Sequence, residues 1–549
     1  MTLLHFFINK IVDTRSSITV TSSTNIEIPH IPIALTSLPP TTVDEVLKTM
    51  LSSNKTFSPS DPFPSKLISS ISTILAPHLV KLFNCSFSTG IFPKAFKHAY
   101  VKPLLKKPNL DPEESSSYRP VSLLPFFSKI LERLVKSRLL DHMSKFINFE
   151  TFQSGFKEFH STETALLCVT NDLRLSADAG FVTLLILLDM SAAFDTLDHE
   201  ILIKRLSDFL GVDEEAFQVQ QGADTSQSVP LQHGVPQGSV LGPLLFRIYI
   251  FPLLVLLSNL GVSFHCYADD TQIYIPCKIP NFLNCVESVN NIYKSISDWL
   301  SNNYLKLNDN KSEIILIGTP SAVSQCKEAA TSINLGTSNI PFSSTVKNLG
   351  VIFDESLSFT QHIKQCRKSS FFMLKNLGRV RNHFDQASFE TLIHAFISSK
   401  LDYCNSLFIN LPNCTLNGLQ AIQNYAARLV LRQGRFCHIT PLLEKLHWLQ
   451  VPDRIKFKTL LLTFNAIHFS NPPYLKNQLD FKSHNRLLRD QDHLQLEIPR
   501  SHSTRMGDRA FSIAAPTLWN CLPFEMRNVS SVDTFKSLLK THLFRATYS

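Results

Sequence analysis

The sequence contains no CxxC pair, although 11 cysteines are spread along its 549 residues. A disulfide framework and a zinc knuckle both need cysteines at short, regular intervals, so this spacing argues against either. Scattered cysteines fit a reducing, intracellular environment best. The first residues, MTLLHFFINKIV, lack the basic segment and the small-residue cleavage site of a signal peptide. We therefore expect a short amphipathic helix here, and a protein that is not secreted.

No clean apolar run approaches the ~20 residues that a membrane span needs. The closest candidate, IYIFPLLVLLSNLGVSF at residues 248–264, is interrupted by proline, asparagine and glycine. We expect a buried helix followed by a strand, and no membrane partner. Lys and Arg number 53 against 45 Asp and Glu, a net charge of +8. This mild basic excess is compatible with nucleic-acid binding but does not identify it.

The chain is long enough for two to four domains and shows no internal repeat. Residues 1–60 are rich in Ser, Thr and Pro, which predicts a weakly ordered leader. A helical pattern runs from Leu67 to Ser88. The segment FFSKILERLVKSRLLDHM is amphipathic, with apolar residues on one broad face and charged residues, including Glu132, elsewhere. From Ser356 to about Phe469 the pattern is almost wholly helical.

The run FVTLLILLDM is continuously apolar and ends at Asp189. Such a run suits a strand that is covered on both faces, with a carboxylate at its end. A helix is predicted from His199 to Leu210, and the glycine-rich HGVPQGSVLGPLLF leads into another. NLGVIFD, at residues 348–354, is predicted to form one more strand.

The stretch FHCYADDTQIY places Asp269 and Asp270 between two apolar, β-prone segments. It predicts either a hairpin whose tip is acidic or a metal site. If the strand that ends at Asp189 pairs with this hairpin, three carboxylates meet at one sheet edge and need a cation to stay ionised. Oxygen ligands select Mg²⁺. Two such ions are the usual apparatus of nucleotidyl transfer.

Taken together, several motifs resemble the reverse transcriptases of non-LTR (LINE-type, Jockey-like) retrotransposons. The three most specific are YADD, LLDMSAAFDTLDH and GVPQGSVLGPLLF. Others follow in the family's order, from about residue 40 to the end: YRPVSLL, FQSGFKEFHST, LKLNDNKSEIILIG, KNLGVIFD, LDYCNSLFINLP and RAFSIAAPTLWNCLP. A lone YxDD is a weak signal, whereas this ordered series is specific.

The resemblance implies an α+β fold, the right-hand polymerase, with fingers, a palm built on a small antiparallel sheet, and a helical thumb. The domains expected from it are a leader at 1–60, fingers and palm at 61–355, a thumb at 356–450 and a C-terminal helical region at 451–549. The implied partners are an RNA template, a DNA primer and deoxynucleoside triphosphates. Access to the nucleus, besides the cytoplasm, is implied by the family alone.

The resemblance also assigns catalytic roles. The metal ligands would be Asp189, Asp269 and Asp270, with Mg²⁺, or Mn²⁺ in its place, as the metal. Lys311 would donate a proton to the leaving pyrophosphate, but it can equally be a surface lysine.

The incoming nucleotide would meet a second group of residues. Its phosphates would contact Arg119, because a guanidinium binds phosphate in a bidentate manner. Lys106, with Lys107, would assist, although a solvated turn is an equally good interpretation of these lysines. Phe194 would exclude a ribose 2′-hydroxyl, or be a core phenylalanine. Gln237 would lie beside the nascent base pair, with neighbouring glycines allowing close backbone approach.

Nucleic acid would contact further residues. The template would meet Gln153, Gly155 and His160, and the turn at Gly350 would support the primer end. Basic residues recur on the predicted thumb helices, and as a stripe they favour sequence-independent phosphate contacts, although each alone suits a solvated helix face. They are Lys364, Arg367, Lys368, Lys375, Arg379, Arg381, Arg428, Arg432 and Arg435.

The chain departs from the family pattern twice. Relatives usually carry an endonuclease domain upstream, whereas a short leader precedes the predicted fingers here, so we expect no self-made nick. Between Val212 and the glycine-rich motif the chain also lacks a helix and a basic hairpin of the palm. This shortening would expose apolar sheet surface, at about 25 cal/mol per Å². Two hypotheses follow: an RNA-directed DNA polymerase, or an inactive, retrotransposon-derived protein that binds nucleic acid.

Overall fold

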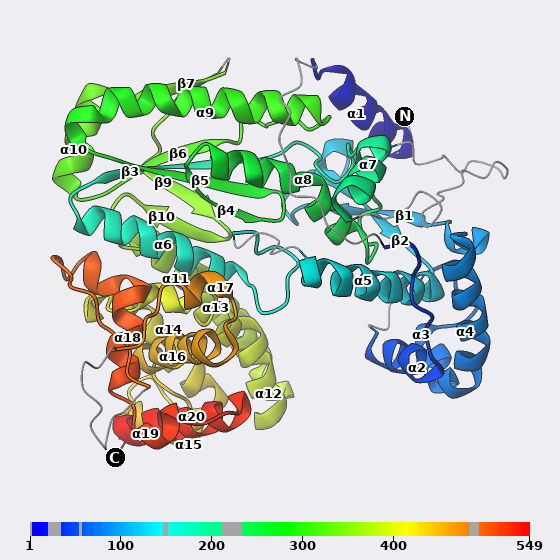
Figure 1. Cartoon of the computed structure of the whole chain (residues 1–549). Coiled ribbons are helices and arrows are strands. Elements are labelled where there is room, and N and C mark those ends of the chain that lie inside the picture. Colours follow the sequence, from blue (N-terminus) through cyan, green and yellow to red (C-terminus); the bar gives the residue numbers. More distant parts are fainter. Residues whose placement is uncertain are drawn as a thin grey trace. The chain divides into compact units, whose positions relative to one another are not determined.

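The computed structural model describes residues 3–19, 35–53, 58–146, 152–210, 233–336, 338–482 and 494–548. Two compact units make up the chain, each from separate stretches of sequence. Unit 1 comprises Met1–Glu150, Asp189–Gly261 and Asn291–Asn308, and unit 2 comprises Thr151–Leu188, Val262–Asn290 and Asp309–Ser549. Helices predominate, and every described strand ladder is antiparallel, which confirms the predicted α+β class (Figure 1).

Unit 1 consists of helices around one two-stranded hairpin, β1 (Tyr100–Leu105) with β2 (Tyr118–Leu123). Its helices are α1 (Leu3–Ser16), α2 (Val43–Ser52), α3 (Ser65–Ser70), α4 (Ser72–Thr89), α5 (Phe126–Phe146), α7 (His199–Leu210) and α8 (Gly242–Asn259). The end of α9 (Phe282–Asn302) also belongs to this unit. The helices predicted at the chain start, after Leu67 and at His199–Leu210 are confirmed.

Unit 2 is built on a four-stranded sheet in the order β4-β5-β3-β6. Its strands are β4 (Ser263–Tyr267), β5 (Asp270–Cys277), β3 (Val182–Leu188) and β6 (Glu313–Ile317). All of β3 is buried except Leu187, which is half-buried, as predicted for a strand covered on both faces. The helix α6 (Thr162–Asp178) packs on this sheet (Figure 1).

Helix α6 begins where the local sequence satisfies its first backbone donors. The Ser161 hydroxyl accepts a hydrogen bond from the Thr164 N–H (3.1 Å), and the Thr164 hydroxyl accepts one from the Ser161 N–H (2.9 Å). This reciprocal arrangement is a capping box. It fixes the start of the helix that covers the sheet.

Smaller hairpins follow the sheet in unit 2. They are β7 (Ser332–Leu335) with β8 (Ser338–Pro341), and β9 (Thr345–Asn348) with β10 (Val351–Asp354); α10 (Pro320–Ala329) precedes them. The single strand predicted for NLGVIFD is therefore wrong. The chain reverses at Leu349 and Gly350, whose φ angles are +42° and +87°, so Asn348 ends one strand and Val351 begins the next.

The remainder of unit 2 is helical, as predicted from Ser356 onward. Its main helices are α11 (Thr360–Val380), α12 (Gln386–Ile393), α13 (Ser399–Leu401), α14 (Asn413–Val430), α15 (Thr440–Lys445), α16 (Val451–Phe469), α17 (Pro473–Lys476), α18 (Phe511–Asn520), α19 (Phe524–Arg527) and α20 (Val532–Tyr548). These helices share one hydrophobic core with the sheet, which extends from Leu166 on α6 through Leu185 on β3 to Leu543 on α20.

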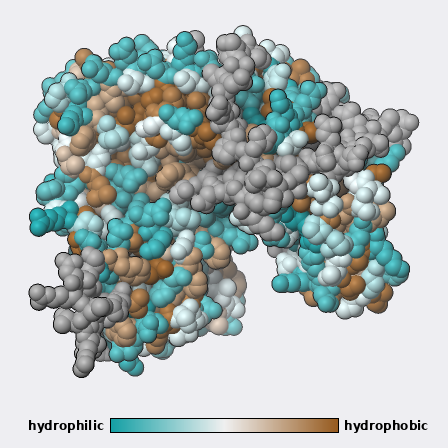
Figure 2. Space-filling view, in the orientation of Figure 1, coloured by the Kyte–Doolittle hydropathy of each residue, from teal (hydrophilic) through white to brown (hydrophobic). Residues whose placement is uncertain are grey.

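Helix α9 is buried on one side only, whereas helix α8 is buried nearly all round. The buried residues of α9 include Val289, Tyr293, Ile296 and Leu300, which recur at helical spacing. Its outer edge is mainly hydrophilic or neutral in Figure 2. Helix α8 is long and apolar enough to cross a membrane, but 67% of it is buried inside the protein. The core helix of a protein without a membrane span can have the same length and composition. The predicted buried helix followed by a strand is confirmed as α8 followed by β4.

Four sequence-based expectations are wrong or stay untested by the structure. Glu132 was placed on a charged face of its helix, but it is buried, with 6% of its surface exposed. Its carboxylate accepts hydrogen bonds from the N–H groups of Val240 (2.6 Å) and Leu241 (3.0 Å) ahead of α8. Within the expected leader, α1 and α2 are regular helices. The shortened palm segment falls on residues 211–232, outside the described residues. The linear domain boundaries remain predictions.

Candidate active site

The acidic pair lies at the tip of the β4–β5 hairpin. Tyr267 pairs with Asp270, which leaves Ala268 and Asp269 as a two-residue loop. Ala268 has a φ of +59°, a conformation that favours glycine and costs an alanine about 1–3 kcal/mol. The tip is therefore a strained turn that its surroundings must hold in place.

Gln153 holds this turn through its side-chain amide. Its Oε1 accepts hydrogen bonds from the N–H groups of Ala268 (3.0 Å) and Gly155 (2.8 Å), and its Nε2 donates to the Ala268 carbonyl (3.2 Å). Gln153 has no exposed surface, so it supports the turn from inside the protein. A Cβ on Gly155 would lie 2.2 Å from the Ala268 nitrogen. Both residues therefore have a structural role, and the template role expected for them stays a prediction.

A second support reaches the same hairpin from the C-terminal helices. The Ser154 hydroxyl lies 2.8 Å from His265 Nε2 and 3.0 Å from the Tyr474 hydroxyl, which donates to Thr164 Oγ1 (2.8 Å). Burial, aided by the positive charges of His160 and Lys157, lowers the pKa of His265 to about 3. The imidazole is therefore neutral at physiological pH. His160, expected to contact the template, packs edge-on against Tyr474, with ring centroids 5.4 Å apart.

Asp189 directly follows β3 and is held by Asn308. The Asn308 backbone N–H donates to the Asp189 carbonyl (2.8 Å), and its side-chain amide donates to Asp189 Oδ2 (3.2 Å). One residue on, Met190 and Leu307 form an isolated antiparallel bridge. Asn308 belongs to the motif LKLNDNKSEIILIG, but the sequence did not predict that it would hold Asp189.

A cavity of about 190 Å³ in unit 2 joins the hairpin to the turn between β9 and β10. It is lined by Leu187, Leu188, Asp270, Thr271, Gln272, Lys347, Asn348, Leu349 and Gly350. The Asn348 amide donates to Gln272 Oε1 (2.6 Å), and the Tyr403 hydroxyl donates to the Leu349 carbonyl (2.7 Å). The turn at Gly350, expected at the primer end, thus shares a cavity with the carboxylate of Asp270.

The glycine-rich motif packs against the chain that follows Asp189. Gln237 Nε2 donates to Asp195 Oδ1 (2.9 Å), and the Gln237 carbonyl accepts from the Ser122 N–H (2.7 Å). Burial raises the pKa of Asp195, while the bond from Gln237 acts in the opposite direction. A Cβ on Gly238 would lie 2.6 Å from the Ser122 oxygen, so glycine here allows close approach to the backbone of β2, whereas its approach to a base pair stays a prediction. The anchoring role of Asp195 was not predicted.

The sequence left Phe194 as either a residue that excludes a 2′-hydroxyl or a core phenylalanine, and its position fits both. Its ring stacks on the buried Phe246, with centroids 4.4 Å apart and 23° between the planes, and it remains partly exposed. Its carbonyl accepts a hydrogen bond from the Val235 N–H (2.9 Å). The ring is thus fixed by packing and is only partly buried.

Most of the remaining predicted cations are exposed, whereas Arg381 is buried. Arg119 pairs with Leu104 across the β1–β2 hairpin, where Lys106 Nζ donates to the Ser116 carbonyl (2.8 Å). Lys311 is exposed in the turn before β6. Arg381, predicted for the basic stripe, is buried and donates to the carbonyls of Leu429, Phe384 and Val430. Its guanidinium therefore supports the surrounding helices.

Within the part of the chain that the structure describes, no three His, Cys, Asp or Glu side chains cluster closely enough to hold a metal ion alone. The donors at the candidate site are nevertheless the hard oxygens that Mg²⁺ binds. Asp270 is exposed within the cavity and Asp189 is half-buried. Mg²⁺ usually takes one or two carboxylates and completes its shell with water and substrate phosphates. The donor set fits such an ion.

Comparisons with known proteins agree with this chemistry. Residues 105–353 match the family model described as reverse transcriptase (RNA-dependent DNA polymerase). The chain is 28% identical over 308 residues to the RNA-directed DNA polymerase from mobile element jockey of Drosophila melanogaster, covering 53% of this chain and 32% of the relative. It is 25% identical to the probable RNA-directed DNA polymerase from transposon BS of the same species, covering 70% and 43%. The chain thus spans less than half the length of these relatives.

One solved structure shares only a distant likeness with the chain. It is telomerase from Candida albicans in complex with a TWJ fragment of telomeric RNA, at 13% identity and a TM-score of 0.29. The match covers 67% of this chain and 65% of that one. At this TM-score the likeness carries no argument about the site.

Proposed function

Because this chain carries a reverse transcriptase domain and belongs with the RNA-directed DNA polymerases of non-LTR retrotransposons, we propose that it extends a DNA primer on an RNA template. The observation that carries the proposal is the strand register in unit 2, where Leu188 pairs with Thr271. Asp189 directly follows the first of these residues and Asp270 directly precedes the second. Both acids therefore belong to the same end of the β3–β5 ladder.

In the proposed reaction, Asp189, Asp269 and Asp270 hold the divalent metal, with Mg²⁺ as the expected ion. When bound, the metal supplies charge stabilisation for the phosphoryl group and for the attacking 3′-hydroxyl. The protein contributes position. Asn308 fixes one carboxylate, and Gln153 fixes the turn that carries the other two. The exposed ammonium of Lys311 is proposed as the proton donor to pyrophosphate.

The proposed nucleotide contacts come from unit 1. Arg119 and Lys106 are exposed on the β1–β2 hairpin and suit the phosphates of the incoming nucleotide. Gln237 is oriented by Asp195, so its remaining surface can face the nascent base pair. The stacked ring of Phe194 is rigid enough to exclude a 2′-hydroxyl.

Helix α11 supports the proposal of a nucleic-acid partner. It contains no acidic residue and carries five exposed cations, four of which recur at spacings that place them along one helix face. We name these four the α11 stripe: Lys364, Lys368, Lys375 and Arg379. The exposed Phe372, with 67% of its surface accessible, lies on the same face. Cations interleaved with an aromatic ring suit the sequence-independent binding of a nucleic-acid backbone.

The test is Mg²⁺-dependent extension of a DNA primer on an RNA template, with Asp269→Ala/Asp270→Ala as the control. We expect extension by the wild type and none by the control. Binding of the hybrid by a folded protein without any extension would favour the inactive binding protein instead. Binding of the RNA–DNA hybrid is measured in the same preparations. The loss of binding when alanines replace the α11 stripe is compared with the loss when alanines replace the exposed α20 lysines, Lys536 and Lys540.

A further inference from the structure

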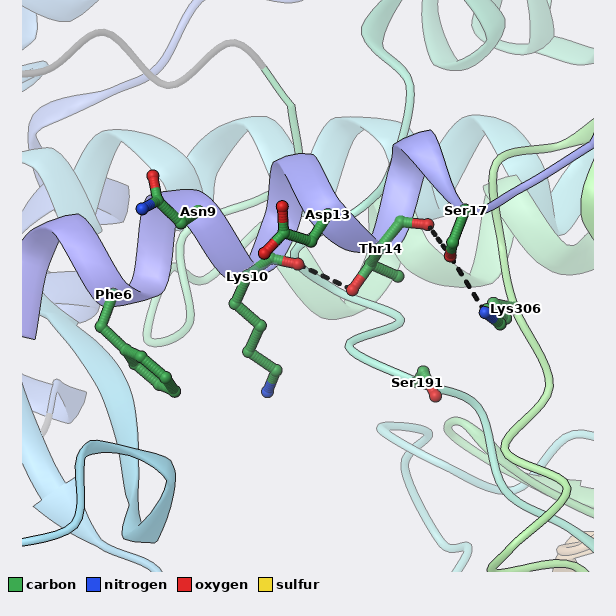
Figure 3. A pocket seen from close by; sticks show the side chains of 8 residues that line it. All are labelled: Phe6, Asn9, Lys10, Asp13, Thr14, Ser17, Ser191 and Lys306. Atoms are coloured by element: carbon green, nitrogen blue, oxygen red, sulfur yellow. Dashed lines mark hydrogen bonds between the residues drawn. The ribbon is translucent and has the colours of Figure 1, made fainter.

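A cavity of unit 1 lies under the N-terminal helix. It has a volume of about 460 Å³, within the range of small-molecule sites. One wall is α1, which contributes Phe6, Asn9 and Lys10, and the opposite wall includes Ser191 and Lys306 (Figure 3). Ser191 lies two residues after Asp189. A helix from the start of the chain therefore covers the segment that follows a candidate metal ligand.

Helix α1 is anchored to this segment by Arg15. Arg15 Nη2 forms an ion pair with Asp198 Oδ2 (2.7 Å), and its Nη1 donates to the Thr196 carbonyl (2.8 Å). The guanidinium also lies over the ring of Tyr304, 4.0 Å from its centroid. The ion pair is largely buried, with 13% and 15% of the two side chains exposed. The position of α1 thus rests on specific contacts at its C-terminal end.

Two ammonium groups line the cavity. Lys306 Nζ donates to Ser17 Oγ (3.0 Å), which uses one of its three protons. Lys10 forms no ion pair among the described residues of the chain. In Figure 3 the side chains of Lys10 and Phe6 extend from α1 toward the side on which Ser191 lies, whereas Asp13 extends the other way. The cavity is therefore lined by two ammonium groups, the carboxylate-bearing Asp13, hydroxyl donors and one apolar ring, so its cations outnumber its anions.

We propose that this cavity binds the polyphosphate group of a nucleotide or of released pyrophosphate, with Lys10 of α1 and Lys306 as its cationic contacts. Ammonium groups act as point charges toward phosphate oxygens, and the Ser191 hydroxyl adds a donor from the opposite wall. The apolar ring of Phe6 suits the base or sugar of a nucleotide. The identification of the ligand as a polyphosphate rests on the proposed function. The charge and volume of the cavity are observed independently of that function. The N-terminal helix becomes part of the substrate site by this assignment.

The test measures binding without turnover. Full-length protein is titrated by calorimetry with inorganic pyrophosphate and with a deoxynucleoside triphosphate in EDTA, so that no divalent metal takes part. The variant is Lys10→Gln, which changes an exposed side chain and should leave folding intact. The matched control is Lys48→Gln, an exposed lysine of α2 outside the cavity. Thermal unfolding of each protein checks that the variants are folded.

We expect Lys10→Gln to weaken binding about 10-fold, the effect of one charge-assisted contact, and Lys48→Gln to leave it unchanged. Binding of both ligands identifies the shared phosphates as the recognised group, and binding of the triphosphate alone identifies the nucleotide. The proposal is overturned if the wild type binds neither ligand, or if Lys10→Gln binds as tightly as the wild type. Primer extension is measured separately, so a protein that binds pyrophosphate through Lys10 but extends no primer retains this site and loses only the proposed function.

Discussion

Replacing Gln153 with alanine removes the three hydrogen bonds that hold the strained tip of the β4–β5 hairpin. The N–H and carbonyl of Ala268 and the N–H of Gly155 all lose their partner. Each buried hydrogen bond contributes about 1 kcal/mol to stability, so we expect a loss of about 3 kcal/mol. Water that enters the vacated space can restore some of these bonds, but it cannot fix the φ of Ala268.

The larger effect is expected on the rate of primer extension. Asp269 is in the loop with Ala268 and Asp270 follows it, so a released turn moves both candidate metal ligands. A displacement of about 1 Å at a reacting centre costs on the order of 100-fold in rate. We therefore expect kcat to fall about 100-fold in Gln153→Ala, with little change in the KM for the nucleotide. Gln153→Glu keeps both acceptor contacts and should lose less.

The control is Gln423→Ala, which removes another buried glutamine of unit 2. Gln423 has 3% of its surface exposed and donates to the Leu449 carbonyl (2.8 Å). Single-turnover extension and urea unfolding are measured for both variants. The reasoning is refuted if Gln153→Ala retains the wild-type kcat, or if both variants lose activity only in proportion to their stability. In either case the amide of Gln153 would be an ordinary buried contact.

Three other changes test separate parts of the structure. Gly155→Ala places a carbon 2.2 Å from the Ala268 nitrogen, so primer extension should fall about as far as in Gln153→Ala, whereas Gly434→Ala, which meets nothing within 4 Å, should retain it. Burial raises the pKa of Asp198, but the hydrogen bond and charge of Arg15, together with two backbone N–H donors, lower it by more, so the pKa lies below its ordinary value of 3.8. The stability advantage of the wild type over Arg15→Ala in urea should therefore be full above pH 3.8 and shrink as the pH falls below it. Alanine in place of the α11 stripe should weaken hybrid binding and lower its log–log salt slope by about one per cation, and the same change at the α20 lysines should not.

The sequence predicted the elements that depend on local pattern. The continuous apolar run before Asp189 predicted a buried strand, and the structure has β3 there at the centre of its sheet. The acidic stretch around Asp269 predicted a hairpin, which is confirmed by the pairing of Tyr267 with Asp270. Both features follow from periodicity and turn chemistry, which are properties of neighbouring residues.

The supports of these elements could not be predicted in the same way. Gln153 contacts Ala268 across 115 residues, and Asn308 contacts Asp189 across 119. A polar residue in a motif looks the same in sequence whether it faces a ligand or a backbone amide. Glu132 was assigned to a charged face for this reason, although it accepts hydrogen bonds ahead of α8. Only the tertiary fold separates these cases.

Tyr474 connects the β4–β5 hairpin to the C-terminal helices of unit 2. Tyr474 lies beyond the predicted thumb, in the predicted C-terminal region, yet its hydroxyl bonds Ser154 beside the hairpin strand. The hydrophobic core of unit 2 likewise continues from Leu185 on β3 to Leu543 on α20. A hairpin that needs a strained φ at Ala268 depends on rigid neighbours, and some of these neighbours come from the last helices. The C-terminal helices therefore belong to the same folded unit as the hairpin that carries Asp269 and Asp270.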